Sequence, residues 1–234
     1  MLEVQSLSVA VNGKLVVRDV SLTLPDGQLH LLLGPNGSGK SSLLSTIMGL
    51  PPFEIVEGDI LLDGSSIIKL DIADRARLGI GIAFQRPPRL DGVSIRQLAR
   101  SVGAADDLAE AANALDLDEF LDRDMQVGFS GGEVKRAEVL KLRLQNPALM
   151  LFDEPESGVD LEHVKDVGRA IEALVRSDNE RSALVITHTG LILNHVAADR
   201  AHVMTEGRLT YSGPANAVFD HVQAYGYGAV PESF

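Results

Sequence analysis

The sequence contains 234 residues, enough to bury one substantial hydrophobic core, with 33 acidic side chains against 21 basic ones and a formal net charge of −12. This negative charge repels the phosphates of nucleic acids and of anionic lipids, which counts against a DNA-organising protein and against one adsorbed to a membrane. The absence of cysteine excludes disulfides, a thiolate nucleophile and a cysteine-ligated metal cluster on this chain.

No apolar run in the sequence approaches the ~20 residues that a membrane-spanning helix needs. Acidic and polar residues interrupt the apolar ones over residues 1 to 10, which is unlike a signal peptide. We therefore expect a cytoplasmic protein with no direct membrane insertion and no nucleic acid partner, so that any role at a membrane would need a partner protein.

The first part of the chain shows the pattern of strands around short helices. Residues 2 to 11 and 15 to 24 partly alternate apolar and polar side chains around the turn Asn12-Gly13. We expect them to form an antiparallel hairpin beside the apolar strand at 29 to 33. The next expected elements are a strand pair at 58 to 64, a short helix at 72 to 78 and a strand at 79 to 84.

The chain changes character at Pro87-Pro88, because two successive prolines continue neither a helix nor a central strand. From residue 90 to residue 145 the strand pattern disappears and apolar side chains recur at helical spacing. Two groups each share one helix face: Ile95, Leu98, Ala99 and Val102, then Leu108, Ala111, Ala112 and Leu115. We therefore expect a helical subdomain at residues 89–145, inserted into a core formed by residues 1–88 and 146–234.

The strand pattern returns after Asn146-Pro147 and alternates with helices. The expected elements are a strand at 148 to 153, a helix at 161 to 175, strands at 183 to 187 and 201 to 204, a hairpin that continues into 208 to 211, and a helix at 215 to 224. This alternation predicts an α/β fold with a largely parallel sheet covered on both faces and antiparallel hairpins at its edge.

A glycine-rich segment between the strand at 29 to 33 and the apolar residues 43 to 48 fits the pattern G-x-x-x-x-G-K-[ST] without a mismatch. Glycines let successive backbone N–H groups turn toward phosphate oxygens, and the following helix directs the positive end of its dipole at them. Lys40 supplies a charge for the β- and γ-phosphates, and Ser41 supplies a hydroxyl for magnesium. The alternative is an ordinary glycine turn before a helix. The predicted phosphate-binding residues are Gly34, Pro35, Asn36, Gly37, Ser38, Gly39, Lys40, Ser41 and Ser42.

Two adjacent carboxylates, Asp153 and Glu154, follow the apolar strand that starts near residue 148. A buried strand that carries an acid at its carboxyl end is the way in which P-loop enzymes hold magnesium, so we expect Asp153 on the metal side. Glu154 would orient and deprotonate an attacking water. The alternative is a pair of acids that only end a strand.

A second phosphate receptor is predicted at Ser130. Ser130 and Glu133 have the spacing of a capping box, which predicts a helix from here to about residue 144. Gly131 and Gly132 in its first turn expose bare backbone N–H groups, so this helix end can receive a phosphate. Capping boxes are common, and a helix start without a ligand is the alternative.

These motifs stand in the order and spacing of the ABC-type ATPases: residues 34 to 42, Gln85, residues 129 to 133, 149 to 154 and 157 to 160, and His188. The chain resembles that family over essentially its whole length. The resemblance implies a P-loop NTPase fold, with a RecA-like core that has an antiparallel β edge, a helical ABC signature subdomain, and hydrolysis of ATP with Mg²⁺.

The same resemblance implies how the site works. ATP at the P-loop of one copy would be completed in trans by Ser130, Gly131, Gly132 and Glu133 of a second copy, in an ATP-dependent head-to-tail homodimer. The implied catalytic residues are Glu154, His188, Lys40 and Gln85. The implied Mg²⁺ ligands are Ser41, Gln85 and Asp153, and the implied D-loop residues are Ser157, Gly158 and Asp160. The other histidines are interpreted as structural: His30, His163, His195, His202 and His221.

Within that family, the segment F-S-G-G-E-V-K-R at residues 129 to 136 is similar to the F-S-G-G-E-K-K-R motif of SufC, the ATPase of the SUF iron–sulfur cluster assembly machinery. Val134 departs from that motif, and Pro155 is the residue of transport ATPases at its position. The resemblance implies a partner that is a SufB-like scaffold, or a SufB/SufD-like pair, rearranged by ATP-driven closure. The alternative is the motor subunit of a membrane ABC importer. A DNA-repair type of ABC protein is disfavoured by the acidity and by the short insert.

Lys135 lies one turn inside the helix that is predicted to start at Ser130. We hypothesise that its ammonium pairs with Glu154 in the resting monomer, keeps the base unproductive, and separates from it on dimerisation.

Overall fold

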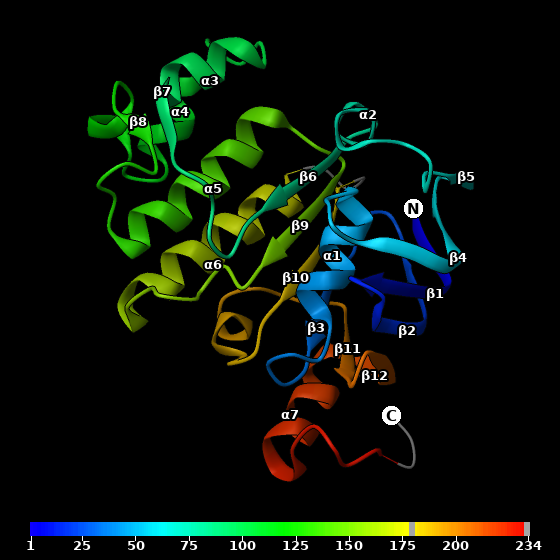
Figure 1. The fold of residues 1–234 in the computed structure, drawn as a ribbon. Coiled ribbons are helices and arrows are strands. Elements are labelled where there is room, and N and C mark those ends of the chain that lie inside the picture. The colour runs from blue at the N-terminus through cyan, green and yellow to red at the C-terminus, as the bar shows by residue number, and fades with distance from the viewer. Residues whose placement is uncertain (178–180, 232–234) are drawn as a thin grey trace.

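A computed structural model describes residues 1–177 and 181–231, and it contains two main sheets that pack around one P-loop helix (Figure 1). The strands are β1 (Leu2–Val11), β2 (Lys14–Leu24), β3 (Leu29–Leu33), β4 (Glu54–Leu62), β5 (Ser65–Ser66), β6 (Ile80–Ala83), β7 (Leu90–Ser94), β8 (Asp124–Met125), β9 (Leu149–Asp153), β10 (Ser182–Ile186), β11 (Arg200–Thr205) and β12 (Arg208–Pro214). The helices are α1 (Lys40–Met48), α2 (Ile72–Arg77), α3 (Ile95–Ser101), α4 (Leu108–Asn113), α5 (Gly131–Gln145), α6 (Leu161–Arg176) and α7 (Ala215–Tyr225), with 3₁₀ turns at Asp118–Phe120 and Leu191–Asn194.

The central sheet has six strands in the order β12-β11-β3-β10-β9-β6. All neighbouring strands in it are parallel except the antiparallel pair β11–β12 at one edge. Every residue of β3 is buried, as the unbroken apolar run at 29 to 33 predicts for a strand covered on both faces. The predicted α/β architecture, with its largely parallel sheet and an antiparallel edge, is therefore confirmed.

Alternate residues of the central strands enter two separate buried clusters. Leu29 and Leu31 pack with α5, α6 and α7, and this cluster continues into α3 and α4. Leu32 packs on the opposite face with α1 and with the sheet that contains β1 and β2. Figure 1 shows α5 and α6 on one side of the central strands and α1 with β1, β2 and β4 on the other. No helix of the described residues is long and apolar enough to cross a membrane.

The N-terminal hairpin lies in a different place from the predicted one. β1 and β2 pair in antiparallel fashion, but they belong to a four-stranded sheet of order β2-β1-β4-β5 and do not pair with β3. Their alternation explains this, because a strand with one polar face suits a sheet buried on one side, whereas β3 lies between two parallel neighbours.

The predicted helical insert also contains a short two-stranded sheet, formed by β7 and β8. The expectation that residues 90 to 145 lack strands is therefore wrong. β7 is largely exposed, so its sequence has no apolar alternation from which a strand could be inferred. The apolar faces of α3 and α4 are buried as predicted, except that Leu98 is half-buried and that Val102 follows the end of α3 and is exposed.

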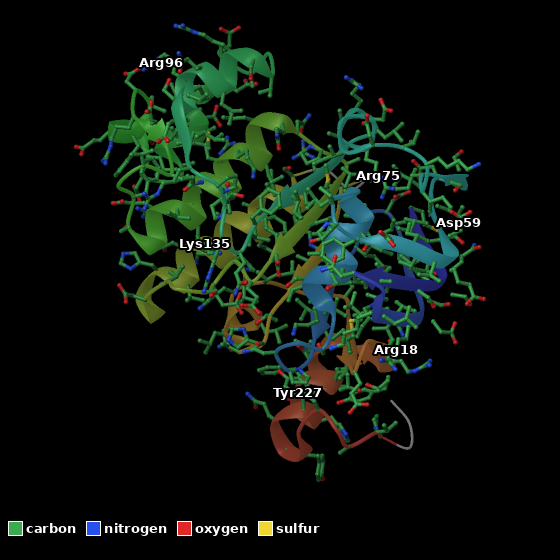
Figure 2. All side chains as sticks on the ribbon, viewed as in Figure 1. Arg18, Asp59, Arg75, Arg96, Lys135 and Tyr227 are labelled. Atoms are coloured by element: carbon green, nitrogen blue, oxygen red, sulfur yellow. The ribbon has the colours of Figure 1, made fainter. Side chains whose placement is uncertain are left out.

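Arg75 on α2 is buried and holds the C-terminal end of α1. Its guanidinium donates to the carbonyls of Thr46, at 2.7 Å, and Ile47, at 2.9 Å. The N–H of the C-cap residue Gly49 also donates to the carbonyl of Thr46, at 3.1 Å, so the arginine adds to the cap of the last turn of α1 (Figure 2). The P-loop helix is thereby fixed at the end opposite the phosphate-binding loop.

Two buried histidines form a hydrogen-bonded chain across β3 and β11. Nε2 of His202 lies 3.0 Å from Nδ1 of His30, whose Nε2 lies 2.7 Å from the side-chain oxygen of Gln28. The hydroxyl of Ser212 lies 2.7 Å from Nδ1 of His202. Burial is the largest cause that lowers the pKa of His30 to about 4 and that of His202 to about 3. Both rings are therefore neutral in the folded protein at neutral pH.

The two buried histidines predict a loss of stability in mild acid. Because the folded pKa values lie below the value of about 6.5 for an unfolded histidine, only the unfolded state takes up the two protons as the pH falls below 6.5. We expect the free energy of unfolding to fall by about 2–3 kcal/mol between pH 7.5 and pH 5.5 from these two groups. Urea unfolding at the two pH values measures the change.

The variant His202→Gln keeps a neutral donor and acceptor but removes one titrating ring, so it should show about half of that loss. His163→Gln is the matched control, because His163 is exposed, and it should keep the full loss. An equal loss in His202→Gln and in the control would contradict the prediction.

Candidate active site

The P-loop connects β3 to α1, and two of its glycines are required by close contacts. A Cβ atom on Gly34 would lie 2.1 Å from the carbonyl oxygen of Met204, and one on Gly39 would lie 2.6 Å from that of Val16. Both glycines also have positive φ angles, 151° and 104°. The strands β2 and β11, which contain Val16 and Met204, therefore press on the loop, and its backbone can only be built with glycine there.

Lys40 starts α1 and folds back over the loop. Its ammonium donates to the carbonyls of Gly34, at 2.8 Å, and Pro35, at 2.9 Å. Burial lowers the pKa of Lys40, and the nearby carboxylates of Glu154 and Asp153 act in the opposite direction. A lysine held by two neutral carbonyls at a helix N-terminus can exchange these acceptors for phosphate oxygens, which bind it more strongly.

Ser41 and Asp153 lie together, although 112 residues separate them in the chain. The hydroxyl of Ser41 donates to Oδ1 of Asp153 at 2.9 Å. Burial raises the pKa of Asp153, and the bond from Ser41 acts against this. A hydroxyl and a carboxylate oxygen side by side fit Mg²⁺, which takes oxygen ligands and completes its shell with phosphates and water. The described residues hold no group of three His, Cys, Asp or Glu side chains that could ligate a metal by themselves.

Glu154 is held by groups from two other loops. The amide of Gln85, after β6, donates to Oε2, and Nδ1 of His188, after β10, lies 3.3 Å from Oε1. The backbone of Glu154 has a φ angle of 47°, in the left-handed region that non-glycine residues rarely adopt. Strained backbone of this kind gathers at functional sites. The two contacts orient the carboxylate of a residue that is only 7% exposed.

These groups open onto one cavity of about 950 Å³. The predicted residues that line it are Asn36, Gly37, Ser38, Gly39, Lys40, Ser41, Ser42, Gln85, Glu154, Ser157 and His188. Ser41 connects Asp153 to the cavity, and Lys40 connects Gly34 and Pro35. Sequence reasoning missed a second part of the lining, formed by Lys14, Leu15, Val16, Arg18, Glu206 and Gly207. The only signal for it was that these residues stand in or beside two predicted hairpin turns.

The capping box at the start of α5 has both of its hydrogen bonds. The N–H of Glu133 donates to Oγ of Ser130 at 3.4 Å, and the N–H of Ser130 donates to the carboxylate of Glu133 at 2.7 Å. Ser130 and Gly131 are exposed, and residues 130 to 133 do not line the P-loop cavity of their own chain. The structure therefore keeps the two predicted phosphate receptors apart within one copy.

Gly131 instead contacts the loop that follows Glu154. A Cβ atom on Gly131 would lie 2.1 Å from the carbonyl oxygen of Gly158, which has a φ angle of 74°. In the same loop, Ser157 lines the cavity and Asp160 stands before the first residue of α6. The start of α5 and the cavity are thus connected through one short segment, residues 157 to 160.

The hypothesised ion pair between Lys135 and Glu154 differs from the contact that the structure shows. The ammonium of Lys135 donates to the main-chain carbonyls of Gln85, at 2.7 Å, Glu154, at 3.1 Å, and Phe84, at 3.4 Å (Figure 2). The carboxylate of Glu154 is held by Gln85 and His188 and already lines the cavity. Lys135 therefore braces the backbone of two site loops, and the idea that it withholds the carboxylate is wrong.

A P-loop with a buried lysine, an adjoining hydroxyl–carboxylate pair and an oriented glutamate define a P-loop NTPase. The comparisons with known proteins make this more specific. The family model described as ABC transporter matches residues 17–157, and the chain belongs to that family. It is accordingly an ATP-hydrolysing cassette, with ATP as its substrate and Mg²⁺ as its cofactor.

Relatives match along nearly the whole chain. A Streptococcus pyogenes protein named "Probable ABC transporter ATP-binding protein" is 36% identical over 99% of this chain and 95% of its own. Vegetative protein 296 of Bacillus subtilis is 35% identical over 97% and 91%, and "Probable ATP-dependent transporter ycf16" of Cyanophora paradoxa is 35% identical over 92% and 89%.

Solved structures confirm the fold. A nucleotide-free ATP-binding cassette from an ABC transporter superposes with a TM-score of 0.81 at 22% identity, covering 96% of this chain and 95% of that one. A cassette solved as a dimer in a post-hydrolysis state with ADP and phosphate gives a TM-score of 0.79 at 19% identity, covering 92% and 98%.

The contact between Gly131 and Gly158 predicts a difference between two adjacent glycines. Gly131→Ala forces its methyl group against a main-chain oxygen, so we expect it to lower the free energy of unfolding by about 1–3 kcal/mol. At Gly132 a Cβ atom would meet its nearest neighbour, His163, at an ordinary 3.9 Å. Gly132→Ala should therefore be neutral or slightly stabilising, since alanine favours a helix over glycine. Chemical denaturation measures both variants, and equal effects would contradict the contact.

Proposed function

We propose that this chain hydrolyses ATP with the site described above and uses the cycle of closing and opening to rearrange a partner protein. The observation that carries this proposal is the carboxylate of Glu154, held by Gln85 and His188 at the cavity that also contains the P-loop. In this role Glu154 takes a proton from the attacking water and His188 contacts the γ-phosphate. Gln85 contacts the attacking water and Mg²⁺.

The phosphates take the place of the carbonyls of Gly34 and Pro35 at the Lys40 ammonium. Ser41, Asp153 and Gln85 supply the oxygen ligands of Mg²⁺, which when bound neutralises charge on the phosphates. The backbone N–H groups of residues 34 to 42 hold the same phosphates. These roles need no movement of Glu154, because its carboxylate already lines the cavity.

The separation of the two phosphate receptors supports a head-to-tail homodimer. Residues 130 to 133 are outside the cavity of their own chain, so a second copy must supply them if they are to contact the γ-phosphate. Because each copy carries both parts, two equivalent sites close together. Ser157, Gly158 and Asp160 then form the D-loop, which links the start of α5 to the cavity.

Glu154→Gln tests the trans site. The amide can still occupy the carboxylate's position but cannot accept the proton, so we expect ATP binding without hydrolysis and an accumulating dimer. Size-exclusion chromatography with ATP and Mg²⁺ measures the dimer, and a phosphate-release assay measures turnover. A variant that binds ATP yet stays monomeric at all protein concentrations would contradict the homodimer.

The partner that we propose is a SufB-like scaffold, or a SufB/SufD-like pair, during iron–sulfur cluster assembly in the cytoplasm. The similarity of residues 129 to 136 to the SufC motif supports it, together with the bracing of two site loops by Lys135 from that motif. The absence of cysteine fits this role, because the cluster ligands would have to lie on the partner. In this proposal residues 89–145 form the signature subdomain and the rest forms the core.

A membrane importer is the second candidate, and the names of two relatives favour it, since one is called an ABC transporter ATP-binding protein and another an ATP-dependent transporter. Affinity purification of the tagged chain from its native cells, with and without detergent, distinguishes the two. We expect a soluble partner without membrane-spanning segments. Recovery of a polytopic membrane protein would favour the importer and contradict the SufB-like partner.

A further inference from the structure

Glu156 is a buried acid that none of the motifs above uses. It lies two residues after Glu154 and is only 4% exposed. Its Oε1 accepts hydrogen bonds from the hydroxyl of Thr187 and, at 3.1 Å, from the hydroxyl of Thr189. These two threonines stand immediately before and after His188, so a single carboxylate oxygen holds both neighbours of that histidine.

The rest of this carboxyl group is poorly satisfied. Among the described residues, Oε2 of Glu156 is buried without a hydrogen-bond partner. Burial raises the pKa of Glu156, and hydrogen bonds from Thr187, from the backbone of Glu156 itself and from Thr189 act against this. A buried polar atom without a partner costs about 1–3 kcal/mol, and a small neutral side chain would avoid that cost. The glutamate in turn accepts from the fully buried hydroxyl of Thr187 and from that of Thr189, which ties it to the loop that carries His188.

The loop that carries His188 is held at further points. The hydroxyl of Thr187 also accepts from the N–H of Gly190 at 2.9 Å. The hydroxyl of Tyr227, beyond α7, donates to the main-chain carbonyl of His188 at 2.9 Å (Figure 2). The imidazole itself is 36% exposed and contacts Glu154 at 3.3 Å. The position of the imidazole therefore depends more on the hydrogen bonds that hold the backbone and the neighbours of His188 than on packing around the ring.

We propose that Glu156 is a positioning residue, which keeps the His188 imidazole against Glu154 and directed at the cavity by holding Thr187 and Thr189. The link runs from the segment that follows β9 to the segment that follows β10, so the two sides of the reacting centre move together. This inference rests on the proposed role of His188 in hydrolysis. It assigns no contact between Glu156 and ATP.

The test compares two substitutions at Glu156. Glu156→Ala removes the shared acceptor and frees the His188 loop, so we expect kcat to fall by about 10- to 100-fold while KM for ATP changes less than about 2-fold. Glu156→Gln keeps Oε1 as the acceptor and puts its amide nitrogen where Oε2 has no partner, so it should recover most of kcat. ATPase assays with Mg²⁺ and a fluorescent ATP analogue for binding provide the two readouts.

A milder variant keeps the test valid if Glu156→Ala does not fold. Thr189 is exposed, so Thr189→Val removes one of the two bonds to Glu156, together with the acceptor of the Leu191 N–H, with little effect on packing, and kcat should fall by about 3- to 10-fold. Thr210→Val is the matched control, because Thr210 is exposed and donates to the carbonyl of Val203 away from the cavity. It should keep the kcat of the unmodified protein.

His188→Ala distinguishes a failure of the positioning role of Glu156 from a failure of the proposed role of His188. If His188→Ala is inactive while Glu156→Ala and Thr189→Val keep full kcat, the positioning role is wrong and the proposed function stands. If His188→Ala itself keeps full kcat, the proposed role of His188 fails, and the inference fails with it. A Glu156→Gln variant as slow as Glu156→Ala would also overturn the inference, because the acceptor would then not be the property that matters.

Discussion

The parallel pairing of β3, β10, β9 and β6 is the constraint on which the whole site depends. These four strands lie next to one another and end at the same edge of the sheet. The P-loop follows β3, His188 follows β10, Glu154 follows β9 and Gln85 follows β6. Residues that are up to 112 positions apart in the chain therefore meet within hydrogen-bonding distance, because parallel strands present their carboxyl ends together. The catalytic groups need only short loops to converge.

The site is assembled at a cost in local stability. Glu154 adopts a left-handed backbone, and Lys40, Asp153 and Glu156 are ionisable groups whose burial disfavours their charged forms. Arg75 and Lys135, both buried, direct their charges at main-chain carbonyls and so fix the ends of helices and loops. The two apolar clusters on either face of the central sheet offset these costs. The rigid frame allows strained groups to persist at the reacting centre.

Sequence reasoning failed where a feature depended on partners distant in the chain. The hairpin of β1 and β2 was recognised from its alternation, but its sheet was not, because alternation shows that one face is buried and not which neighbours bury it. β7 has no apolar pattern, since it is exposed. Lys135 was expected at a carboxylate, and it binds the backbone because the carboxylate of Glu154 is already held by Gln85 and His188. The charge of a lysine does not show whether it binds the side-chain carboxylate or the main-chain carbonyl of Glu154.

By itself the sequence determined the α/β class, the P-loop, the acid pair, the capped helix at Ser130 and the family, because each of these is a local pattern. Glycine spacing, a run of apolar residues and a capping box act over a few neighbouring residues, so they can be read without knowing the fold. Only the tertiary structure decided that Glu154 lies between Gln85 and His188, that Glu156 holds the threonines around His188, and that residues 130 to 133 lie outside the cavity of their own chain. Those facts follow from strand order and from side chains that meet across long separations, which no local pattern records.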